Sequence, residues 1–122
     1  MINIMIVDDS RVVRKLIINI LNNKEFHCIE AENGIEALEK LVSNNIDLII
    51  ADLNMPKMSG LELVKTIRDS EIYNKIPIIM LTTEKNEIEK KKCIEAGVNI
   101  YLVKPLPSVE LENNIKNLLK ES

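Results

Sequence analysis

The sequence predicts an α/β protein built on one doubly wound parallel sheet, a sheet covered by helices on both faces. Three observations lead to this prediction. Five short strand-like runs alternate with helical patterns, the first, third and fourth runs are almost entirely apolar, and 122 residues suit one domain. Central strands of a parallel sheet are buried on both sides, which accounts for the continuous apolar runs.

The expected strands lie near residues 2–7, 26–30, 46–51, 76–81 and 99–103. The second run, Phe26 to Glu30, is more polar than the others and predicts a strand at the edge of the sheet. His27, the only histidine, lies on this edge strand away from the strand ends, so we expect it to have no role in phosphoryl relay.

Three of the expected helices carry an apolar stripe, which predicts a side that faces the core. The stripe residues are Val13, Leu16, Ile17, Ile20 and Leu21 in the first helix, Ala37, Leu38, Leu41 and Val42 in the second, and Leu111, Ile115, Leu118 and Leu119 in the last. The last helix follows Pro107 and Ser108, a favourable start for a helix.

The helix expected over residues 85–96 lacks such a stripe, because the run Lys90-Lys91-Lys92 interrupts its apolar positions. A weak apolar face predicts a loosely held helix. We interpret the lysines as a solvated face supported by a Glu87 to Lys91 pair at i, i+4, with a site for an acidic partner as the alternative.

The overall composition excludes several classes of protein. The formal charge is −3 and no basic stretch alternates with aromatic residues, so we expect no nucleic-acid surface. The apolar N-terminal run is short and is followed by two aspartates, unlike a signal peptide or a membrane-spanning helix. Cys28 and Cys93 have no metal-ligand spacing, and we expect both to be reduced in a cytoplasmic protein.

Residues suited to phosphoryl chemistry follow four of the expected strands: Asp8 and Asp9, Asp52, Thr82, and Lys104. Each has an ordinary explanation by itself, such as a helix cap or a turn. Parallel strands, however, bring these tips to one rim, where ligands of open α/β sheets gather. Carboxylates within about 4 to 5 Å repel by roughly 3 to 4 kcal/mol per pair at an effective dielectric near 20, so three of them require a cation. An all-oxygen ligand set favours Mg²⁺.

This rim is equipped to transfer a phosphoryl group onto an aspartate. With the metal on Asp8 and Asp9, Asp52 keeps a free oxygen that can attack phosphorus and form an acyl phosphate. Such a transfer depends on positioning and charge stabilisation, which the ammonium of Lys104 and the hydroxyl of Thr82 supply. No general base is required.

The chain resembles the receiver domain of two-component response regulators, most closely the free-standing members that act in chemotaxis. The resemblance covers the whole length and rests on VDDSR at 7–11, ADLNMPKMSGLELVKTIR at 51–68, MLTTE at 80–84, EAG at 95–97 and YLVKP at 101–105. It implies a flavodoxin-like (βα)5 fold with strand order 2-1-3-4-5 and one receiver domain over residues 1–122 without an effector domain.

The resemblance also implies residue roles. Asp52 would be the phosphoacceptor, Asp8, Asp9, Asp52 and the backbone carbonyl of Asn54 would bind Mg²⁺, and Thr82, Thr83, Asn54 and Lys104 would contact the phosphoryl group. Tyr101 matches the aromatic residue that changes rotamer when Thr82 moves towards the phosphoryl group. A phosphoryl group adds a charge of roughly −1.5 to −2 and three strong acceptors, enough to shift such a switch.

Three backbone features are implied as well. Lys104-Pro105 would be a cis peptide, and Gly60 and Gly97 match turn positions of the family.

The expected partners are a sensor histidine kinase of the chemotaxis type, which would supply the phosphohistidine, and a downstream motility or adaptor protein. That protein would bind the face made by the fourth helix, the fifth strand and the fifth helix, next to Tyr101. Lys90 and Lys91 depart from the more apolar fourth helix of flagellar-switch binders. A single-domain phosphate shuttle, or a receiver of a non-motility pathway, is therefore the alternative, and we expect a monomer.

Two functions of other classes fit less well. A haloacid-dehalogenase-type phosphatase needs an aspartate two positions after the first, where this chain has Ser10. A flavodoxin-type FMN protein needs a phosphate loop rich in hydroxyls and glycine after the first strand, where Asp8 and Asp9 would repel the ligand.

Overall fold

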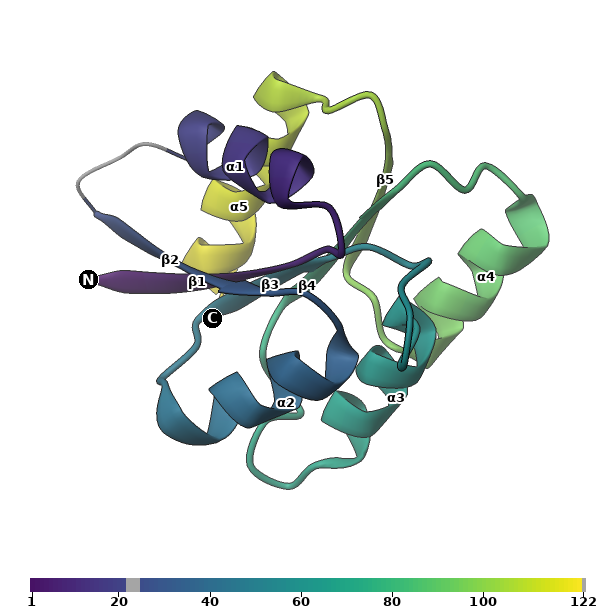
Figure 1. The fold of residues 1–122 in the computed structure, drawn as a ribbon, viewed down its shortest axis with the longest axis horizontal. Helices are drawn as coiled ribbons and strands as arrows, with labels where there is room; N and C mark the ends of the chain where they lie inside the picture. The colour runs from purple at the N-terminus through teal and green to yellow at the C-terminus, as the bar shows by residue number, and fades with distance from the viewer. Residues whose placement is uncertain (22–24, 122) are drawn as a thin grey trace.

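The structure, a computed structural model, describes residues 1–21 and 25–121, and strands and helices alternate throughout them (Figure 1). The strands are β1 (Ile2–Val7), β2 (Phe26–Ala31), β3 (Leu48–Ala51), β4 (Ile78–Thr82) and β5 (Ile100–Val103). The helices are α1 (Arg11–Ile20), α2 (Gly34–Ser43), α3 (Gly60–Asp69), α4 (Glu87–Ala96) and α5 (Ser108–Glu121). The predicted α/β class is confirmed, and strands three and four each begin two residues later than expected.

The five strands form one parallel sheet in the order β2-β1-β3-β4-β5, as predicted. The register pairs Val7 with Ala51, and it pairs Thr82 with Val103. The residues that follow these pairs therefore meet at the carboxyl end of the sheet. The polar β2 lies at one edge, and the apolar β1, β3 and β4 lie in the centre, as the sequence predicts.

Helices cover both faces of the sheet: α1 and α5 pack on one face, and α2, α3 and α4 pack on the other (Figure 1). Ile17 and Ile115 are buried on the first face, and Leu41 and Leu63 are buried on the second. The buried apolar residues described on the first face are all Ile and Leu, and those of the second are mainly Ile, Leu, Val, Ala and Met.

Two residues of the predicted stripes are not in the core. Leu16 is 51% exposed and Val42 is 78% exposed. In α1 the contact side is centred on Ile17 and Arg14, and in α2 on Ala37 and Leu41, so Leu16 and Val42 each lie about a third of a turn away from it.

Helix α4 buries few side chains, in keeping with its missing apolar stripe. Cys93 is its one buried residue, while Ile88 and Ile94 are largely exposed. The predicted ion pair between Glu87 and Lys91 is wrong. Within the part of the chain that the structure describes, the ion pair of α4 joins Glu89 and Lys92 at 3.4 Å. Side chains three or four residues apart are both neighbours across one helical turn, and in α4 the pair three residues apart is the one that forms.

At the amino end of the sheet, the guanidinium of Arg68 in α3 holds two loops together, the one before β4 and the one before β5. Its nitrogens donate to the carbonyls of Gly97, Asn74 and Ile76 and to Oδ1 of Asn99, at 2.7 to 3.0 Å. Gly97 ends α4 at φ 119°, a left-handed conformation that favours glycine. The predicted turn role of Gly97 is thereby confirmed.

Candidate functional site at the carboxyl end of the sheet

The strand ends bring the predicted residues to one rim. Asp8 follows β1, Asp52 follows β3, Thr82 ends β4 and Lys104 follows β5. Carboxylate oxygens of Asp8, Asp9 and Asp52 all lie within 4.8 Å of one another. The convergence that the sequence predicts for these three carboxylates is therefore present in the structure.

Lys104 sits between two of the carboxylates. Its Nζ lies 2.9 Å from Oδ2 of Asp8 and 3.7 Å from Oδ2 of Asp52. Asp8 is 2% exposed and Asp52 is 9% exposed, whereas Asp9 is open to solvent. The other oxygen of Asp8 accepts a hydrogen bond from the backbone N–H of Ser10 at 2.9 Å.

Opposing effects act on the carboxyl group of Asp52. Burial raises the pKa of Asp52, and the neighbouring carboxylate of Asp8 raises it further. Lys104, the Thr82 hydroxyl and the backbone N–H of Leu53 favour the charged form, yet the pKa remains above its usual value. The ionised carboxylate is therefore held at a cost in free energy that additional positive charge would relieve.

The donor set fits a divalent cation. Three carboxylates and one ammonium give a net charge of −3 + 1 = −2, which one divalent ion neutralises. Carboxylate oxygens are the ligands that Mg²⁺ accepts, and Mg²⁺ keeps several waters when it binds to proteins. The exposed side chain of Asp9 leaves one side of the rim open to solvent.

The β4–α4 loop connects Thr82 with Tyr101. The backbone N–H of Glu84 donates to Oγ1 of Thr82 at 3.3 Å, and the hydroxyl of Tyr101 donates to the carbonyl of Glu84 at 2.8 Å. Thr82 is fully buried and Tyr101 is 9% exposed. Burial, more than the nearby acidic groups, raises the pKa of Tyr101 to about 12. One loop residue thus contacts both hydroxyls.

The loop after β3 folds back against Asp52. Gly60 lies so close to the carbonyl oxygen of Asp52 that a Cβ at this position would collide with it. Gly60 is the first residue of α3, so this close approach, and not the predicted turn, is what requires glycine here. Lys57 in the same loop has φ 69°, a backbone conformation that a residue with a Cβ adopts at a cost in free energy.

The remaining predicted residues lie next to the strand ends. Asn54 and Thr83 are exposed. The Lys104-Pro105 peptide is cis, as the resemblance implied.

Sequence reasoning missed Arg14, a residue of α1 that is 7% exposed. Its Nη1 donates to the carbonyl oxygen of Asp8 at 2.7 Å. A signal was present, because Arg14 lies on the same side of the helix as Ile17 and Leu21, three and seven residues on. A charged residue on an apolar stripe indicates a buried side chain that pairs with a polar or charged group.

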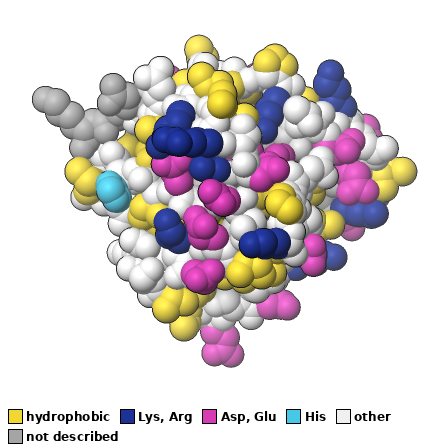
Figure 2. All heavy atoms as spheres, viewed as in Figure 1, with side chains coloured by type: hydrophobic (Ala, Val, Ile, Leu, Met, Phe, Trp, Pro, Cys, Tyr) yellow, Lys and Arg dark blue, Asp and Glu magenta, His cyan; other side chains and the backbone are white. Residues whose placement is uncertain are grey.

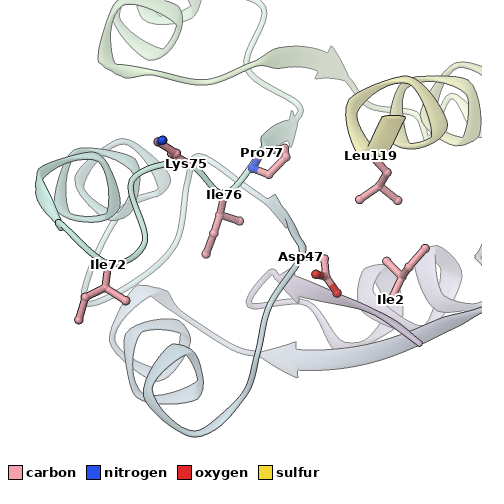
Figure 3. Close-up of a pocket in the computed structure, with 7 residues that line it drawn as sticks. All are labelled: Ile2, Asp47, Ile72, Lys75, Ile76, Pro77 and Leu119. Carbon is pink, nitrogen blue, oxygen red and sulfur yellow. The ribbon is translucent and has the colours of Figure 1, made fainter. Parts of the chain in front are cut away.

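Other features of the surface lie away from the rim. Figure 3 shows a pocket at the amino end of the sheet, lined by Ile2, Asp47, Ile72, Lys75, Ile76, Pro77 and Leu119. In it, the Asp47 carboxylate already accepts a hydrogen bond from the backbone N–H of Asn3. Acidic and basic side chains are interspersed on the face in Figure 2. Within 1–21 and 25–121, no helix is long and apolar enough to cross a membrane.

Comparisons with known proteins agree with this geometry. A family model described as the response regulator receiver domain matches residues 4–116. The chemotaxis protein CheY1 of Helicobacter pylori is 42% identical over 118 residues, which make up 95% of each chain.

Solved structures match over nearly the full length. The chemotaxis response regulator CheY4 of Vibrio cholerae is 35% identical with a TM-score of 0.87, covering 97% of this chain and 98% of that one. The response regulator TrrA of Thermotoga maritima, solved in complex with Mg²⁺ and BeF, is 36% identical with a TM-score of 0.85, covering 97% of this chain and 99% of that one.

Proposed function

The chain belongs to the response regulator receiver domain family, and from this premise we propose that Asp52 accepts a phosphoryl group from the phosphohistidine of a sensor kinase. The modified protein then signals through the surface formed by α4, β5 and α5. It acts as a signalling protein whose own chemistry is limited to the gain and loss of this phosphoryl group.

The observation that carries this proposal is the position of Lys104 between two carboxylates. Its ammonium contacts Asp8 at 2.9 Å and lies 3.7 Å from Asp52, which is nearly buried. A cation at this point offsets charge on Asp52 and on an incoming phosphoryl group alike. Thr82 provides a hydroxyl donor from the neighbouring strand end.

The transfer needs one bond to form and one to break. A carboxylate oxygen of Asp52 attacks phosphorus, and the phosphorus–nitrogen bond to the donor histidine breaks, leaving the electron pair on the imidazole. Lys104 and the Thr82 hydroxyl, with Thr83 and Asn54 nearby, stabilise the charge on the phosphoryl oxygens. Asp52 acts directly as the nucleophile, so no side chain has to remove a proton.

Asp8, Asp9, Asp52 and the backbone carbonyl of Asn54 are the groups that would hold Mg²⁺, which when bound supplies positive charge to phosphoryl oxygens. The Mg²⁺ assignment is supported by the carboxylate oxygens that lie within 4.8 Å of one another. This chain's own part is to hold these oxygens in place: Ser10 and Lys104 fix the carboxylate of Asp8.

The signal travels from Thr82 to Tyr101 through Glu84. A Thr82 hydroxyl that turns to a phosphoryl oxygen releases the backbone N–H of Glu84, whose carbonyl holds the hydroxyl of Tyr101. The rotamer of Tyr101 and the position of α4 therefore depend on the state of Asp52. The burial of a single α4 residue, Cys93, supports the use of this helix as the responsive element.

The relatives named above point to a chemotaxis kinase as the donor and to a motility or adaptor protein as the target. Two free cysteines, Cys28 and Cys93, suit a protein of the reducing cytoplasm. Phosphoryl transfer from a purified chemotaxis kinase of the same organism tests the donor.

The test of the site uses intact-mass spectrometry after incubation with Mg²⁺ and acetyl phosphate. We expect the wild type to gain one phosphoryl group, and we expect Asp52→Asn, or the wild type with a chelator, to gain none. Lys15→Met, a change outside the rim, serves as the matched control and should gain the group like the wild type. Equal gain by Asp52→Asn would sink the proposal.

A further inference from the structure

We propose that Arg14 is a positioning residue for the cation site: it fixes the peptide between Asp8 and Asp9 so that both carboxylates face the rim. This inference rests on the proposed function, since it concerns the binding of Mg²⁺ at that site. It adds a residue of α1 that does not touch the cation.

The contacts of Arg14 are those of a bridge between two strands. Its Nη1 donates to the carbonyl oxygen of Asp8 at 2.7 Å, and its Nε donates to Oε1 of Glu30 near the end of β2 at 2.9 Å. The Arg14 side chain is 8% exposed and that of Glu30 is 30% exposed. A guanidinium can serve two acceptors in fixed directions, which an ammonium on a flexible stem cannot do.

The acceptor on Asp8 explains why this bridge matters. The carbonyl of Asp8 belongs to the peptide that joins Asp8 to Asp9, and a peptide is planar. Fixing its carbonyl oxygen fixes the orientation of that plane, and with it the directions in which both side chains leave the backbone. Asp8 is also held through Ser10, whereas Asp9 is exposed and depends more on this peptide.

Glu30 offsets the positive charge of Arg14, which would otherwise repel a cation bound at the rim. Its carboxylate pairs with Arg14 and also with Lys15 at 2.7 Å, and its backbone carbonyl accepts a hydrogen bond from Lys40 at 2.9 Å. The hydrogen bond from Lys15, followed by the one from Arg14, lowers the pKa of Glu30. Glu30 is thus a charged partner that offsets the positive charge of the guanidinium.

Charge and positioning predict opposite results for this residue. As a positive charge alone, Arg14 repels Mg²⁺, so its removal should tighten binding. As a positioning residue, Arg14 orders the ligands, so its removal should weaken binding. Partners in the outer shell of a metal site typically contribute about 10-fold to 100-fold in affinity.

The experiment measures the Mg²⁺ affinity of the full chain by isothermal titration calorimetry, with folding checked by circular dichroism. Arg14→Met removes charge and bridge, Arg14→Lys keeps the charge and loses the bridge, and Lys15→Met removes a charge from the same Glu30 without touching Asp8. We expect roughly tenfold weaker binding for Arg14→Met, weaker binding for Arg14→Lys, and a change within about twofold for Lys15→Met.

A second readout separates positioning from a general loss of structure. At saturating Mg²⁺ the rate of phosphorylation by acetyl phosphate should return to near the wild-type value in Arg14→Lys. Unchanged affinity in Arg14→Lys, or tighter binding in Arg14→Met, would overturn the inference while the proposed function stands. Absence of Mg²⁺ binding by the wild type would instead contradict the proposed function itself.

Discussion

The two ends of the sheet treat buried charge in opposite ways. At the amino end, one guanidinium, that of Arg68, makes five hydrogen bonds to carbonyl and amide oxygens. At the carboxyl end, oxygens of three carboxylates lie within 4.8 Å of one another, and the ammonium of Lys104 pairs with two of them, Asp8 and Asp52. The first arrangement satisfies its charge by hydrogen bonding, and the second leaves negative charge in excess.

This difference separates stability from function within one small fold. Burial raises the pKa of Asp52, so the ionised form of this carboxyl group is disfavoured by its surroundings. Arg68 closes loops that precede β4 and β5, and so it helps to hold the sheet on which the rim is built.

Arg68→Met should lower the free energy of unfolding by about 3 kcal/mol, because it leaves several carbonyl oxygens without their charged donor. Urea denaturation measures the loss. Lys65→Met, an exposed change on the same helix, should lower stability little. A loss as small as that of Lys65→Met would show that the amino end does not carry the stability assigned to it.

Asp52→Asn should raise stability at neutral pH in the presence of a chelator, by less than Arg68→Met lowers it. The folded pKa of Asp52 lies above the unfolded one, so ionisation of Asp52 costs stability as pH rises from about 4 through the folded pKa. The gain from Asp52→Asn should therefore be present at pH 7 and fade below about pH 4. Thermal unfolding at both pH values measures it, and a loss of stability at pH 7 would contradict an unfavourable rim.

Tyr101→Phe should lower the free energy of unfolding by about 1 kcal/mol at neutral pH, since it removes the hydrogen bond to the carbonyl of Glu84. Because the folded pKa of Tyr101 is about 12, ionisation disfavours the folded state, and stability should fall as pH rises from about 10 to 12. The variant should show a shallower alkaline loss. Urea denaturation at several pH values measures this loss. If the free energy of unfolding falls equally with pH in both proteins, the hydroxyl of Tyr101 is not buried as described.

Lys57→Gly should raise stability by about 0.5 kcal/mol, the smallest effect. Lys57 has φ 69°, and glycine relieves the strain while adding unfolded-state entropy that offsets part of the gain. Lys57→Ala keeps the strain and should gain nothing. A gain in Lys57→Ala equal to that in Lys57→Gly would mean that the loop next to Asp52 is not strained.

Much of the carboxyl end could be predicted from the sequence because its residues follow apolar runs directly. The run before Asp52 and the run before Asp8 are continuous, so the ends of the strands are unambiguous. In a parallel sheet these ends share one edge, which is enough to bring the carboxylates together. The family motifs then assigned the order of the strands and the individual roles.

The rest could not be predicted because it depends on long side chains and on the exact centre of each helix face. Arg14 and Arg68 reach acceptors whose positions are set by tertiary packing, so the sequence shows that Arg14 lies on the apolar side of its helix but not which group it contacts. Leu16 and Val42 were placed in the core because periodicity gives the side of a helix only to within about a third of a turn.

The most direct test of the central role of the rim is to locate the phosphoryl group. Borohydride reduction converts an aspartyl phosphate to homoserine, which peptide mass mapping can assign to one position. After incubation with acetyl phosphate and Mg²⁺, we expect homoserine at position 52, and none in a sample treated with chelator. Homoserine at Asp8 or Asp9, or at none of the three, would contradict it.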